Sequence, residues 1–83
     1  MEVYRTSIGT SAYILGDDGV YVGTVLATTH GLGSSVYVAK AVHRDDDLSI
    51  DNVLIAYGVE VNGDVKIYVT EPTPIRITII KDL

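Results

Sequence analysis

The sequence predicts an all-β protein: a small antiparallel β-sandwich or barrel of six to seven strands, built from sequential hairpins. Val, Ile and Thr supply 29 of the 83 residues and Tyr another 6, and these residue types favour a pleated, half-buried surface. Turn-forming residues recur about every ten positions and separate short runs in which apolar side chains alternate. The length suits one domain, so residues 1–83 are expected to form a single all-β domain.

The clearest local feature is a hairpin within residues 52–70, with Asn-Gly at its turn. A two-residue loop would put the apolar face of one strand beside the polar face of the next. A three-residue loop of residues 61–63, with Gly63 left-handed, avoids this mismatch. A neighbouring loop of residues 62–64 is the alternative, because it also keeps the odd-numbered residues of both strands on one face. The first register pairs Val59 with Val65, Tyr57 with Ile67 and Ile55 with Val69.

The other strands are expected in order along the chain. Their ranges are 2–6, 12–15, 20–28, 35–44 and 75–81. Residues 20–28 and 35–44 carry apolar side chains on both faces, with Val36, Val38 and Val42 expected to share one face. An antiparallel strand of a small monomer usually has one polar face. This doubling therefore suggests sandwich packing on one face and a partner on the other.

Acidic residues concentrate in three of the expected turns, at residues 17–18, 45–51 and 71. If the strands from Ala12 onward form an up-and-down meander, these turns fall at the same end of the molecule. The opposite end would then be nearly neutral. A Greek-key crossing would scatter the acidic side chains instead.

The composition restricts the classes of binding partner and the cellular locations that we expect. A net charge of −5 with only six Lys and Arg argues against nucleic acid and against anionic membranes. Cysteine is absent, which excludes disulfides and thiolate metal sites, and the scarcity of thermolabile side chains favours a thermostable protein. Glu2 and Arg5 interrupt the N-terminus, and the uncharged residues 20–39 alternate as strands do. We expect neither a signal peptide nor a transmembrane segment, and a cytoplasmic or virion location.

The acidic connection before the hairpin contains one pattern of potential metal ligands. Asp45, Asp47, Ser49 and Asp51 alternate like the first oxygen ligands of a calcium loop. Ile50, however, stands where the sharp turn of such a loop needs glycine. A solvated acidic loop is the favoured interpretation, and a weak cation site or partner-binding loop is the alternative.

No catalytic or cofactor-binding motif is recognisable. The Gly-rich segment 31–33 joins two expected strands, whereas phosphate-binding loops lead into a helix. His30 and His43 are the only histidines and cannot supply the three or four ligands of a zinc site. There is no nucleophile elbow. We therefore predict no enzymatic activity, no cofactor and no metal.

Four tyrosines within expected strands are the candidate interface residues: Tyr21, Tyr37, Tyr57 and Tyr68. Their rings could pack in the core with the hydroxyl at its rim, or anchor a half-wet protein interface. A third interpretation is a stacking platform for a ligand on an OB-type face. The sequence leaves all three open.

Positive hydropathy, doubly apolar strands and the lack of a catalytic constellation together indicate a non-enzymatic structural or interaction protein that forms a β-rich homo-oligomer. Residues 19–48 contain a strand, a Gly-rich turn, a Val-rich strand and a polar loop ending in leucine. This spacing resembles that of tailed-phage head decoration proteins, which are small β-rich trimers that bind and reinforce capsids. The resemblance covers about a third of the chain. It implies a viral protein or another large-assembly component, and it transfers no site residues.

Two other functions are compatible with the sequence. One is a monomeric OB-like or SH3-like barrel that binds a peptide or small ligand, with the tyrosines grouped on one face. The other is an acidic inhibitor of a nucleic-acid-binding protein, which only the expected acidic end supports.

Overall fold

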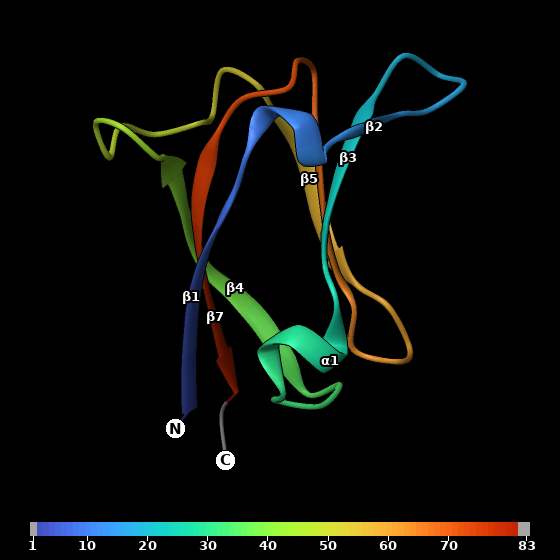
Figure 1. Ribbon diagram of the computed structural model, residues 1–83, viewed down its shortest axis with the longest axis vertical. Coiled ribbons are helices and arrows are strands. Elements are labelled where there is room, and N and C mark those ends of the chain that lie inside the picture. The colour runs from blue at the N-terminus through green and yellow to red at the C-terminus, as the bar shows by residue number, and fades with distance from the viewer. Residues whose placement is uncertain (1, 82–83) are drawn as a thin grey trace.

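Two antiparallel sheets packed face to face form the molecule, as the computed structural model shows for residues 2–81 (Figure 1). Sheet A has the strand order β1-β7-β4, and sheet B has the order β2-β3-β6-β5. The strands are β1 (Glu2–Ile8), β2 (Ile14–Leu15), β3 (Tyr21–Val25), β4 (Val36–His43), β5 (Leu54–Val59), β6 (Val65–Val69) and β7 (Ile75–Lys81). Two single helical turns, η1 (Thr10–Ala12) and α1 (Ala27–His30), lie between strands. The predicted all-β sandwich is confirmed.

The core lies between the two central strands, β6 and β7. Their inward side chains are fully buried, because each strand has neighbours on both sides and the opposite sheet over its inner face. These side chains are Val65, Ile67, Val69, Ile75, Ile77 and Ile79. Burying such branched apolar side chains contributes about 1.5–3 kcal/mol each, which is the main stabilising term in a chain without disulfides.

Across residues 2–81, only β2–β3 and β5–β6 form sequential hairpins, and the remaining connections cross from one sheet to the other. The up-and-down meander is therefore wrong. Strand directions nevertheless alternate from β2 onward, so the turns around residues 17–18, 45–51 and 71 still lie at the same end (Figure 1, top). The expected acidic end exists, because alternating strand directions alone place these turns together.

The β5–β6 hairpin has the predicted three-residue loop. Val59 pairs with Val65 and Tyr57 with Ile67, and the Glu60 amide donates to the Asp64 carbonyl at 2.8 Å. Gly63 has a φ of 99°, in the left-handed region. The predicted pair Ile55 with Val69 is wrong, because a bulge at Ile55 lets Leu54 pair with Val69. The extra residue turns Leu54 toward the core, where it packs.

A second bulge, between Val38 and Lys40, changes the faces of β4. After it, Ala41 pairs with the buried Ile77, and Val42 pairs with the outward Arg76. The expectation that Val36, Val38 and Val42 share one face is therefore wrong. The inserted residue shifts the alternation by one position, which a period-two pattern cannot anticipate.

The strand expected over residues 20–28 ends at Val25, because α1 follows it and packs against the tip of the β5–β6 hairpin. The Ala27 amide donates to the Asp64 carboxylate at 2.7 Å. His30 is buried, and its Nδ1 accepts from the Leu32 amide at 3.0 Å. Its Nε2 must then carry the proton, which it donates to the Gly63 carbonyl at 2.7 Å. These contacts join two segments that the sequence placed only at the same end of the molecule.

Tyr13 fills the inner face of sheet B beside Gly23, where a Cβ would lie only 2.9 Å from the Tyr13 ring. The ring is buried, and its hydroxyl has no hydrogen-bond partner among residues 2–81. Burial disfavours the phenolate, which raises the pKa of Tyr13 to about 12.

The protein should lose stability as the pH rises from about 10 to about 12, because Tyr13 then ionises more readily in the unfolded chain than in the folded one. Below this range both states keep the proton, and the contribution of Tyr13 to stability is fully present. Urea unfolding of wild type and Tyr13→Phe across this range measures the effect. The Phe variant should show a shallower decline, and parallel declines would contradict the buried hydroxyl.

Candidate functional site

The four edge strands of the sandwich differ in how they discourage pairing with another chain. β1 carries Glu2 and Arg5, and β2 is only two residues long. β4 carries Lys40 beside its bulge. Charges, bulges and short length are the usual protections of an edge. β5 (Leu54–Val59) has six residues and no charge, and its bulge lies at its first residues, so Ala56–Val59 run regularly.

The exposed side chains of β5 are large and apolar. Ile55, Tyr57 and Val59 are 50%, 51% and 37% exposed, although Tyr57 and Val59 pair with fully buried residues of β6. Tyr57 and Val59 lie on the inner side of sheet B, at a position that sheet A does not cover completely, and Ile55 occupies the bulge next to them. We call Ile55, Tyr57 and Val59 the β5 edge. The inner face of sheet B is therefore partly exposed to solvent along β5.

The backbone of the β5 edge is also available for pairing. In an antiparallel ladder, successive residues direct their N–H and C=O groups alternately toward one neighbour and the other. Glu60 bonds to Asp64, so Gly58 and Ala56 are the β5 residues that bond to β6. Tyr57 and Val59 therefore direct their amide and carbonyl groups toward the free side of the sheet. The β5 edge combines apolar side chains with unpaired backbone groups.

The structure distributes the four candidate tyrosines over several surfaces. Tyr57 lies on the β5 edge, whereas Tyr21 packs against the core from β3. Tyr68 pairs with Val22 on the outer face of sheet B. Tyr37 pairs with Ile80 on the outer face of sheet A. The four rings form no common platform, and only Tyr57 combines exposure with an unprotected edge.

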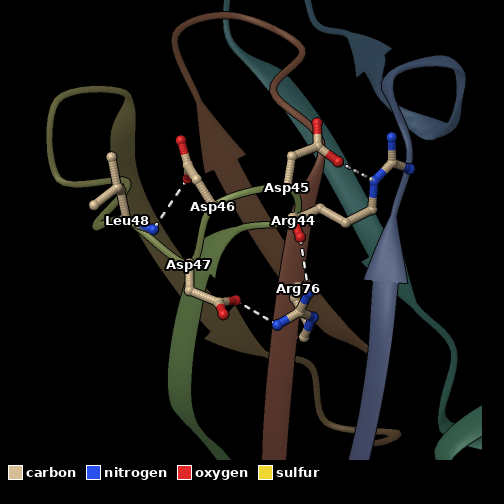
Figure 2. Close-up of polar contacts among 6 residues, drawn as sticks. All are labelled: Arg44, Asp45, Asp46, Asp47, Leu48 and Arg76. Atoms are coloured by element: carbon tan, nitrogen blue, oxygen red, sulfur yellow. Dashed lines mark hydrogen bonds and ion pairs between the residues drawn. The ribbon is translucent and has the colours of Figure 1, made fainter.

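The carboxylates of the acidic loop engage neighbouring groups individually (Figure 2). Asp45 lies 3.5 Å from the Arg44 guanidinium, and Asp46 accepts from the Leu48 amide at 3.1 Å. Asp47 adopts a positive φ of 58°, which points its carboxylate at Arg76 of β7, and the two form an ion pair. The Asp47 amide donates to the His43 carbonyl at 2.9 Å and the His43 amide donates to the Leu48 carbonyl at 2.8 Å, and these two bonds close the turn.

The alternative interpretation of the acidic loop, a weak cation site, finds no assembled ligand set among residues 2–81. The Asp51 amide donates to the Ser49 hydroxyl at 3.2 Å, as in a simple turn. Within residues 2–81, no three His, Cys, Asp or Glu side chains are grouped to hold a metal ion. Asp47 already bonds to an arginine. The loop holds the Arg76 guanidinium through the Asp47 carboxylate and the Arg44 carbonyl.

The sheet order creates one cluster that the sequence did not indicate. Arg5 of β1 and Lys40 of β4 both pair with Thr78 of the intervening β7, on the outer face of sheet A. Arg76 lies two residues from Thr78 on the same face. These four residues line a hollow of about 480 Å³, which we call the basic hollow. They are separated by up to 73 positions in sequence, so no local pattern could have revealed them.

Comparison with known proteins gives no further guide. No family model, no curated protein and no solved structure matches this chain. Across residues 2–81, no helix has the length and apolar character needed to cross a membrane.

Proposed function

We propose that this chain is a non-enzymatic structural protein that forms a homo-oligomer, and that a second copy pairs with it along the β5 edge. The observation that carries the proposal is the contrast among the four edge strands of residues 2–81: β5 alone is long, uncharged and apolar, while charges, a bulge or short length protect the other three. Tyr57 and Val59 offer unpaired backbone groups to the same partner. A β-strand added there would complete both the ladder and the inner face of sheet B.

Two-fold symmetry fixes the register of such a pair. A two-fold axis perpendicular to the sheet keeps inner faces together, so only residues of the same parity can face each other. The axis that centres the apolar side chains places Tyr57 opposite its own copy and Ile55 opposite Val59 of the second copy. Tyr57 then exchanges both backbone hydrogen bonds with its copy, as its outward-directed groups require.

The charge distribution agrees with an antiparallel pair. Each chain carries a net charge of −5, and its acidic turns lie at the end where β5 begins (Figure 1). Antiparallel pairing of β5 places the acidic end of one copy beside the nearly neutral end of the other. Parallel pairing would bring the two acidic ends together, which like-charge repulsion disfavours.

Light scattering behind a sizing column, over about a hundredfold dilution, tests the proposal with Tyr57→Lys and a matched Tyr37→Lys variant. Tyr37 is a similarly exposed strand tyrosine, but it lies on the outer face of sheet A. Wild type and Tyr37→Lys should be oligomers. Tyr57→Lys should dissociate at least about 100-fold more readily, because two ammonium groups would meet at the axis. A wild-type monomer at every dilution would overturn the proposal and favour a monomeric binding module.

A further inference from the structure

We propose that the basic hollow binds a phosphate-type oxyanion. Arg5 and Lys40 flank Thr78 on the two strands beside it, and Arg76 lies next to Thr78 along β7. Three cationic side chains thus surround a threonine hydroxyl that can donate to an anion. This combination of donors on several sides of one hollow suits a tetrahedral, doubly charged group. The site lies on sheet A and is independent of the β5 edge.

The charge balance of the molecule makes this cluster unusual. Three of the chain's six Lys and Arg residues gather in one hollow, although the protein carries a net charge of −5. In the part of the chain that the structure describes, the ion pairs are Arg44 with Asp45 and Arg76 with Asp47. Arg5 and Lys40 therefore have no carboxylate partner there. Arg5 and Lys40 face each other across β7, and an anion bound between them would offset the repulsion of their like charges.

Asp47 shows that the hollow accepts an oxyanion. Its carboxylate reaches one side of the hollow and bonds to Nη1 of Arg76 (Figure 2). Nη2 of Arg76 donates to the Arg44 carbonyl at 2.7 Å, so two contacts fix the orientation of the guanidinium. A pre-positioned arginine loses little side-chain entropy on binding. The bound anion would lie above Thr78, between Arg5 and Lys40, with Arg76 at its side.

Titration of the amide resonances with inorganic phosphate, up to about 50 mM at constant ionic strength, tests the site directly. The Thr78 and Lys40 amides should shift and saturate. The double variant Arg5→Gln/Lys40→Gln should weaken binding at least about tenfold, and the charge-matched control Lys66→Gln/Lys81→Gln should leave it unchanged. Asp47→Asn should tighten binding, because it removes a competing carboxylate but tolerates the left-handed backbone.

Three results would overturn the proposal. The first is a linear, unsaturated shift in wild type. The second is equal weakening in the two double variants, which would indicate a general effect of net charge. The third is saturation by acetate at the same concentration as by phosphate, which would assign the hollow to carboxylates. None of these results depends on the oligomeric state, so failure here is distinguishable from failure of the β5 pairing.

Discussion

Gly63→Ala should destabilise the protein by about 3 kcal/mol or more, as measured by urea unfolding. Gly63 has a φ of 99°, which an L-residue adopts only with strain. A Cβ at this position would also lie 2.6 Å from the Gly33 carbonyl oxygen and 3.2 Å from the Ala27 Cβ. The Gly33 contact is with backbone, which cannot rotate away as a side chain could. The energetic costs of backbone strain and of steric overlap therefore add in this variant.

Gly19→Ala is the matched control for this prediction. Gly19 also has a positive φ, of 81°, but no atom lies within 4 Å of a Cβ built there. This variant should lose only the conformational term, about 1 kcal/mol. Equal losses in the two variants would contradict the packing of the hairpin tip against residues 27–33.

Ile77→Ala should cost about 2–5 kcal/mol, because Ile77 is fully buried on the central strand of sheet A and its truncation leaves a cavity. Ile80→Ala removes the same atoms from the same strand, but from the partly exposed outer face. It should cost about 1 kcal/mol or less. Chemical denaturation of both variants measures the difference, and a reversed order would mean that β7 packs with its other face inward.

Features set by a few neighbouring residues were predictable from the sequence. Parity excluded a two-residue loop and left two three-residue loops, residues 61–63 and 62–64, of which the structure has the first, with a left-handed Gly63. The last strand was predicted with its observed bounds, residues 75–81, because Pro74 ends the preceding segment and the isoleucines alternate. In both cases the deciding interactions are local.

Pairings between distant segments were not predictable in the same way. β7 lies between β1 and β4, two strands that are both separated from it in the sequence by other strands, and no periodicity encodes that choice. The bulges at Ile55 and after Val38 each invert the faces of one strand end. α1 replaces a strand end because Asp64 and Gly63, far along the chain, bond to Ala27 and His30.

The candidate site reflects the same division. Tyr57 was identifiable as a strand tyrosine, but its exposure depends on how far sheet A extends over β5. Asp47 was noted for its spacing within an acidic run, whereas its contact with Arg76 depends on the pairing of β4 with β7. Residue type indicated which side chains could take part in an interface or an ion pair. Only the sheet order showed which of them meet.

Amide hydrogen exchange at Tyr57 and Val59 is the most direct test of β5 pairing. In a monomer both amides point to the free side of sheet B and should exchange rapidly, while Gly58 and Glu60, bonded toward β6, remain protected. At high protein concentration we expect Tyr57 and Val59 to become protected, and to lose that protection on dilution. Rapid exchange of both amides at every concentration, beside protected Gly58 and Glu60, would contradict assembly through the β5 edge.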